Sequence, residues 1–105
     1  MADLLLEWLE FARDGLNQRG YSVKAQAIAG DWQRSISVDI DGSKFVGGIC
    51  HWPPNLFEFQ FNDIDSGDVI FLETVTLENL KDISDYVEIV LSKIDRGEKG
   101  FGLNH

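Results

Sequence analysis

Cys50 and His51 are the first residues in this chain whose types could do chemistry together. A thiol beside an imidazole is the combination that a cysteine nucleophile and its general base require. The segment around Cys50 is predicted to be a β-strand, however, and neighbouring residues of a strand point to opposite faces of the sheet. We therefore expect no catalysis from this pair and predict that the protein is not an enzyme.

A second candidate is the acidic segment from Asp63 to Asp68, which is spaced somewhat like a calcium-binding loop. Such a loop has glycine at its sixth position and glutamate at its twelfth, whereas here Gly67 is fifth and Thr74 is twelfth. We expect an acidic hairpin turn in which Asp63, Asp65 and Asp68 are solvated and bind no calcium. One cysteine and two histidines offer little for any other metal site, so no metal and no cofactor are predicted.

Acidic residues dominate the same part of the chain. The interval from Phe45 to Leu80 has no lysine or arginine, and its acidic residues are Glu58, Asp63, Asp65, Asp68, Glu73 and Glu78. The whole chain has a formal net charge of −9, which would repel a nucleic-acid backbone or an anionic membrane. We expect neither as a partner, and a sheet built from this interval would suit a basic protein surface.

The composition indicates one globular domain. The chain has 105 residues with a hydrophobic fraction of 44%, enough for a single core. The N-terminal segment lacks the features of a targeting sequence, and no apolar run is long enough to span a membrane. A single cysteine excludes an internal disulfide and fits a reducing compartment, so a cytoplasmic location is expected.

Hydrophobic periodicity predicts five strands, with one helix before them and one helix after them in the chain. Apolar residues recur at helical spacing over 3–19 and 77–94, the second helix being capped by Thr76, and strands are predicted at 21–29, 32–40, 44–50, 56–62 and 69–75. The links are short, so successive strands should pair antiparallel. This predicts an α+β fold in which both helices pack on one face of a five-stranded antiparallel sheet. The shared core is expected to contain Leu9, Ile36, Val38, Phe59 and Val87. We predict one domain over 1–95 and a flexible C-terminal tail over 96–105.

The strand pattern also predicts which side chains are exposed. In 56–62 the three phenylalanines face the core and Glu58 faces outward, whereas in 69–75 Phe71 and Glu73 share a face. Placing Glu73 outward exposes Phe71 as well. Trp52 is held by the two prolines after it, at a break in the ladder over 51–55, and either closes the end of the core or anchors a partner. The predicted partner-binding residues are Trp52, Glu58, Asp63, Asp65, Asp68, Phe71 and Glu73.

Two adjacent glycines, Gly47 and Gly48, lie inside the predicted strand over 44–50. Glycine in the interior of a strand indicates a bulge or the close approach of another backbone.

A family resemblance rests on two features of the sequence. One is the set of three tryptophans, Trp8, Trp32 and Trp52, and the other is the segment Trp52-Pro53-Pro54, which precedes the phenylalanine-rich strand. In length, acidity and these markers, the chain resembles the small immunity proteins of bacterial polymorphic and contact-dependent toxin systems. It is similar to the tryptophan-marked type called TriTu, over about residues 5–94. The resemblance implies a cytoplasmic antidote that binds and blocks a cognate toxin domain, often a nuclease, and that has no catalytic residues. A nuclease attracts phosphates with a basic cleft, and an acidic surface complements such a cleft.

Three other classes of protein have to be weighed. A secretion chaperone is also small, acidic and α+β, but it usually dimerises and inserts a helix between its strands, whereas here five strands are uninterrupted and a free monomer is expected. Another kind of small protein-binding module would show the same acidic α+β pattern. An enzyme or small-ligand binder would need a base–nucleophile pair, a glycine-rich phosphate loop or a metal set, and the sequence contains none of these motifs.

Overall fold

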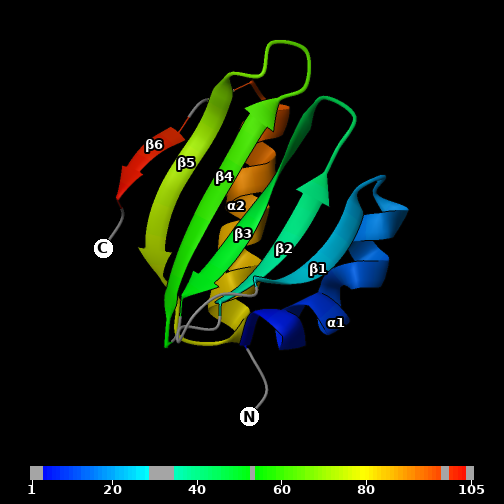
Figure 1. Cartoon of the computed structure of the whole chain (residues 1–105). Coiled ribbons are helices and arrows are strands. Elements are labelled where there is room, and N and C mark those ends of the chain that lie inside the picture. The colour runs from blue at the N-terminus through cyan, green and yellow to red at the C-terminus, as the bar shows by residue number, and fades with distance from the viewer. Residues whose placement is uncertain (1–3, 29–34, 53, 98–99, 104–105) are drawn as a thin grey trace.

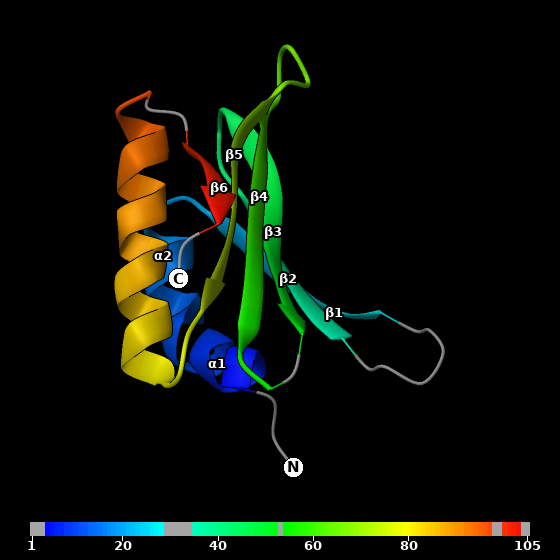
Figure 2. The same ribbon diagram turned by 90° about the vertical axis from the view of Figure 1, so that its left-hand side faces the viewer.

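Two helices cover one face of a twisted sheet, and the other face is left open (Figure 1). The computed structural model describes residues 4–28, 35–52, 54–97 and 100–103. In chain order the elements are α1 (Leu4–Gln18), β1 (Ser22–Ile28), β2 (Ser35–Asp41), β3 (Phe45–Trp52), β4 (Leu56–Asp63), β5 (Val69–Thr76), α2 (Leu80–Asp95) and β6 (Gly100–Leu103). Figure 2, turned by 90°, shows both helices on the same side of the sheet.

The strands lie side by side in the order in which they occur in the chain, from β1 to β6. The first five pair antiparallel with their neighbours, as short links require. The predicted α+β fold, with five antiparallel strands between two helices, is confirmed. The sixth strand was missed: within the segment expected to be a flexible tail, Gly100–Leu103 pairs in parallel with β5.

The core lies between the sheet and the two helices. The three phenylalanines of β4 are at most 1% exposed, as predicted, and they meet Trp8 and Leu9 from α1 and Val87 from α2 in one cluster. Val38 is fully buried in the same cluster, and Ile36 packs against it while only partly buried. The predicted shared core is thus confirmed. Trp32 lies outside the described residues.

The end of β3 differs from the prediction. The sequence predicted a break in the ladder from His51, but β3 continues to Trp52, which pairs with Leu56 of β4. His51 is buried and stacks on Phe57 at 4.2 Å between ring centroids. Its Nε2 donates to the carbonyl oxygen of Pro54 at 3.0 Å, since a carbonyl can only accept. This hydrogen bond holds the turn at Pro54 against the core, and β3 therefore continues as far as Trp52.

The start of α2 also differs. The helix was predicted to begin after Thr76, but it begins at Leu80 and its N-cap is Asn79. The Asn79 side chain accepts a hydrogen bond from the backbone N–H of Asp82 at 2.9 Å. The Asp82 carboxylate accepts one in return from the N–H of Glu78 at 3.2 Å. The first of these bonds satisfies a backbone N–H of the first helical turn, and the second ties the residue before the N-cap to that turn, so the helix is capped at Asn79 and not at Thr76.

Candidate functional site

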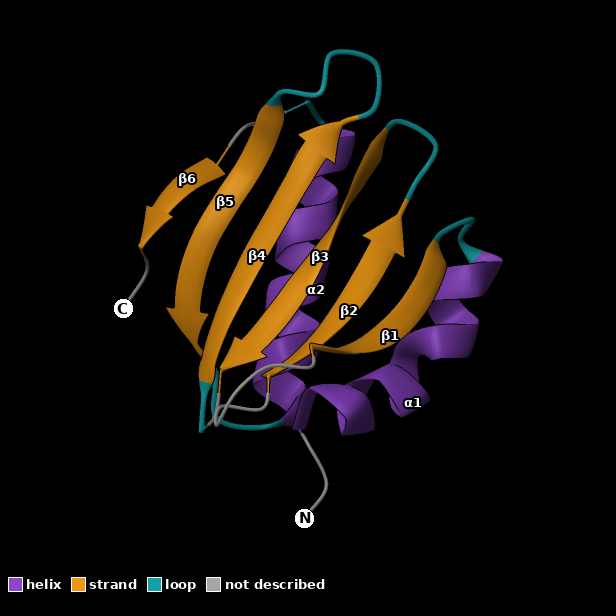
Figure 3. Cartoon of the chain, viewed as in Figure 1, coloured by secondary structure: helices purple, strands orange, loops and turns teal. Residues whose placement is uncertain are grey.

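We call the side of the sheet that faces away from both helices the open face; it is turned toward the viewer in Figure 3. Its side chains follow from the strand register, since Cys50 pairs with Ser37 on one side and with Glu58 on the other. By alternation, the outward positions of β2 to β5 include Ser37, Asp39, Val46, Gly48, Cys50, Trp52, Leu56, Glu58, Gln60, Asn62, Leu72 and Thr74. Cys50 and His51 accordingly point to opposite faces, as predicted.

A shallow hollow of about 320 Å³ lies at the centre of the open face, where Gly48 has no side chain. A Cβ at Gly47 would lie 2.2 Å from the carbonyl oxygen of Gln60, and one at Gly48 would lie 2.4 Å from the carbonyl oxygen of Val38. The predicted close approach of another backbone is therefore confirmed at both positions. We call this space the glycine hollow; it is lined by Ser37, Asp39, Val46, Gly47, Gly48, Ile49, Cys50, Glu58, Gln60 and Asn62.

The glycine hollow is negatively charged. Burial raises the pKa of the Cys50 thiol, and the carboxylates of Glu58 and Asp39 raise it further. Both acidic side chains therefore act electrostatically at the same point in the hollow. Asp39 also accepts a hydrogen bond from the Nε2 of Gln26 at 2.9 Å. The sequence analysis missed Asp39 because it lies outside the interval without lysine or arginine; only the pairing of β2 with β3 brings it here.

Apolar side chains lie beside the hollow at the end of β3. Trp52 is 38% exposed, and Leu56, its partner across β3 and β4, is 42% exposed. Trp52 thus lies at the surface, and its role as an anchor for a partner stays a prediction. Exposed aromatic and aliphatic side chains next to charged ones are typical of the centre of a protein–protein interface.

The predicted positions of Phe71 and Glu73 on the open face are wrong. Phe71 is fully buried and Glu73 is 7% exposed, because both point toward the helices. Glu73 pairs with Phe59 across β4 and β5, which fixes the two on the same face. Neither residue belongs to a contact surface on the open face.

The turn between β4 and β5 carries three predicted acidic residues, and one of them is not simply solvated. Asp63 accepts hydrogen bonds at its Oδ1 from the backbone N–H groups of Asp65 at 2.8 Å and of Ser66 at 3.0 Å, so it shapes the turn. Gly67 adopts a φ of +76° in the same turn, which glycine tolerates best. Asp65 and Asp68 are exposed, as predicted. Among the described residues, no group of three or more acidic, histidine or cysteine side chains is placed to hold a metal ion.

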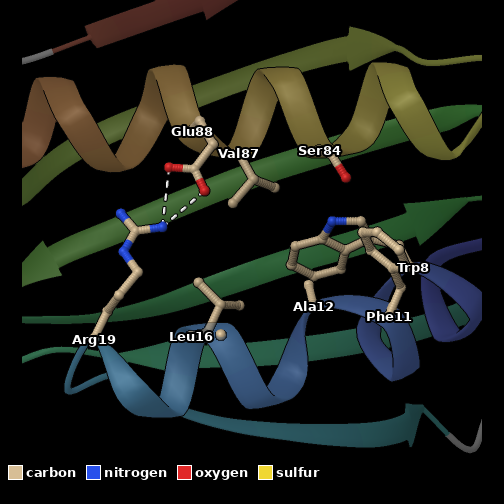
Figure 4. Close-up of a pocket in the computed structure, with 9 residues that line it drawn as sticks. Trp8, Phe11, Ala12, Leu16, Arg19, Ser84, Val87 and Glu88 are labelled. Carbon is tan, nitrogen blue, oxygen red and sulfur yellow. Dashed lines mark hydrogen bonds and ion pairs between the residues drawn. The ribbon is translucent and has the colours of Figure 1, made fainter.

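A second hollow, of about 300 Å³, lies on the other side of the molecule between α1 and α2 (Figure 4). Phe11 on its rim is 79% exposed, which the sequence analysis did not single out. Arg19 closes one end by bonding Glu88 of α2, at 2.7 Å and 3.0 Å to the two carboxylate oxygens. The lining of this second hollow is largely apolar. Its two charged residues, Arg19 and Glu88, neutralise each other, so the hollow presents no net charge to a partner.

Gly15 lines this second hollow from the middle of α1. A Cβ at this position would meet no atom within 4 Å, and its φ is not positive. Gly15→Ala should therefore raise the free energy of unfolding by roughly 0.5–1 kcal/mol, since alanine favours the helix and restricts the unfolded chain. Urea denaturation followed by circular dichroism measures this. Gly20→Ala is the matched control and should destabilise, because Gly20 has a φ of +94°. A loss of stability in Gly15→Ala would contradict the helical geometry at that site.

Comparisons with known proteins name the family. None of the helices in the described ranges is long and apolar enough to cross a membrane. The comparison with curated proteins and that with solved structures give no match. The family model described as "Immunity protein TriTu" matches residues 3–93, which is most of the chain. This range includes α1, β1 to β5 and all but the last two residues of α2. The chain therefore belongs to the TriTu immunity protein family.

Proposed function

We propose that this protein neutralises a cognate toxin nuclease in the cytoplasm by covering its basic surface with the open face. One observation supports this most: the open face and its adjoining turn carry Glu58, Asp65 and Asp68 in an interval without any lysine or arginine. An ordinary solvated surface intersperses both signs of charge. Membership of an immunity family implies the toxin partner, and the acidic surface fits a protein whose substrate is a polyanion.

Charge and apolar contacts have different roles in this proposal. The acidic side chains steer the toxin toward the open face and raise the association rate. Long residence on the toxin needs buried anchors, for which Trp52 and Leu56 are exposed beside the charges. Inhibition then follows from occlusion of the nuclease cleft. It requires neither catalysis nor a cofactor of the immunity protein, which we expect to be a monomer when free.

The direct test uses the toxin domain encoded beside this chain. The two proteins should co-purify as a 1:1 complex by light scattering, and co-expression should restore growth to cells that make the toxin. The association rate should fall steeply with rising salt, because screening removes the steering. A chain that is a stable dimer when free would favour the chaperone alternative. Failure to form a complex or to restore growth would overturn the proposal.

Trp52→Ala should raise the dissociation rate of the complex by roughly 30-fold, equivalent to about 2 kcal/mol, and change the association rate little. The reason is that an aromatic anchor acts once the complex has formed, after steering has ended. Surface plasmon resonance at fixed salt separates the two rates. Phe11→Ala is the control, since Phe11 is an exposed aromatic on the helix layer. A larger effect from Phe11→Ala than from Trp52→Ala would move the interface to the helices.

A further inference from the structure

The floor of the glycine hollow is formed by main chain at the centre of the sheet. No side chain can be added at Gly47 or Gly48, because the nearest backbone oxygens would lie within 2.2 Å and 2.4 Å of the new Cβ atoms. The space above them can therefore be filled only from outside the sheet. Its volume of about 320 Å³ leaves room for a side chain that protrudes from a partner, between β2 and β4.

The walls of the hollow offer acceptors on both sides. Asp39 stands on β2 and Glu58 on β4, with β3 between them. Within the described part of the chain, no hydrogen bond or ion pair forms at the Glu58 carboxylate. Gln60 adds a side-chain carbonyl oxygen on the Glu58 side, whereas the Asn62 Oδ1 accepts a hydrogen bond from the Nε2 of Gln60 at 3.5 Å. None of the lining residues is cationic. Lys24 of β1 pairs with Asp39 on the side away from Glu58, so a cation between the two walls would have to come from a partner.

From this arrangement we infer that the glycine hollow receives one arginine side chain of the toxin, between Asp39 and Glu58. The inference rests on the proposed function and specifies the contact at its centre. A guanidinium has donors on a planar fork and can reach acceptors on both walls at once, whereas an ammonium group is a compact point charge. The flat glycine floor allows a planar group to lie against the sheet. Trp52 and Leu56 then cover the adjoining apolar strip and keep water from the ion pairs.

Cys50 provides a reporter, because it lines the hollow and is the single cysteine of the chain. The experiment measures its alkylation by N-ethylmaleimide, followed by mass spectrometry, in the full-length protein alone and saturated with the toxin domain encoded beside it. We expect modification in the complex to be at least tenfold slower. The mass of the modified chain distinguishes Cys50 from any cysteine of the toxin.

Neutral variants test the two walls. Asp39→Asn and Glu58→Gln should each weaken toxin binding by about tenfold or more, while Asp14→Asn on the exposed side of α1 makes the same charge change and should leave binding unaltered. In the free protein both wall variants should speed Cys50 alkylation at a fixed pH, since the removal of a nearby negative charge lowers the pKa of the thiol. Thermal melting of each variant confirms that the fold is retained.

The arginine itself is identified by a double-mutant cycle. Each arginine of the toxin surface is replaced by alanine and combined with Glu58→Gln, and one arginine should show strong coupling. A complex that forms with Cys50 alkylated at the free rate would overturn the inference and move the interface away from the glycine hollow, while neutralisation of the toxin would still stand. Protection of Cys50 without coupling to any arginine would also overturn it. Absence of any complex would instead refute the proposed function.

Discussion

Phe59→Ala should lower the free energy of unfolding by roughly 3–5 kcal/mol, the usual cost of deleting a buried aromatic side chain. Phe59 is fully buried at the middle of β4. Its ring meets Tyr86 of α2 edge-on, at 4.8 Å between centroids, so the cavity would open between sheet and helix. A domain of this size has a total stability of roughly 5–15 kcal/mol, so the variant would lose a large fraction of it.

Urea denaturation monitored by circular dichroism measures this loss. Gln60→Thr is the matched control, because Gln60 follows Phe59 in the strand but its side chain is exposed on the open face. Its effect should stay within about 0.5 kcal/mol. A loss below about 1 kcal/mol in Phe59→Ala would mean that the space between β4 and α2 can close without the ring.

Replacing Glu58, Asp65 and Asp68 together with lysine should slow association with the toxin by at least tenfold at low salt and flatten the salt dependence. The change raises the formal net charge from −9 to −3, since each replacement alters it by 2. Steering by an acidic surface then becomes repulsion from a basic one. Asp63 is left in place because its carboxylate shapes the turn, so its replacement would confuse binding with folding. Stopped-flow association at several salt concentrations measures both effects.

The control carries the same charge change on the helix layer, with Glu7, Glu10 and Asp14 of α1 replaced by lysine. Its association should be slowed much less, and cells should remain protected. If the open-face variant instead binds at the wild-type rate and protects cells, its acidic residues are only a solvated surface. The interface would then be sought around Phe11 on the helix layer.

The phenylalanines of β4 were assigned correctly because polar residues separate them without exception. β5 could not be assigned in the same way, since strict alternation sets Phe71 and Val75 against Ile70 and Leu72, and the sequence does not show the irregularity that lets Ile70 pack against the core. Its two faces are nearly equal in hydrophobicity, and the assumption that a glutamate faces solvent decided the choice wrongly. Only the pairing of β5 with β4 resolves it.

Other differences come from contacts between distant segments. β6 is four residues long, contains two glycines and pairs with β5 across the intervening α2, so no local pattern predicts it. Asp39 joins the acidic residues of the open face only through sheet pairing, and Asp63 is withdrawn from them by hydrogen bonds within its own turn. The sequence predicts which residues alternate, but the composition of the candidate site depends on strand register.

β6 also bears on how the protein folds. It covers the outer edge of β5, whose N–H and C=O groups would otherwise be free to pair with another chain. Because β6 follows α2 in the chain, this cover can form only after the helix has docked and returned the chain to the sheet. Detachment of β6 would leave β5 as an unprotected edge, at which another chain could pair.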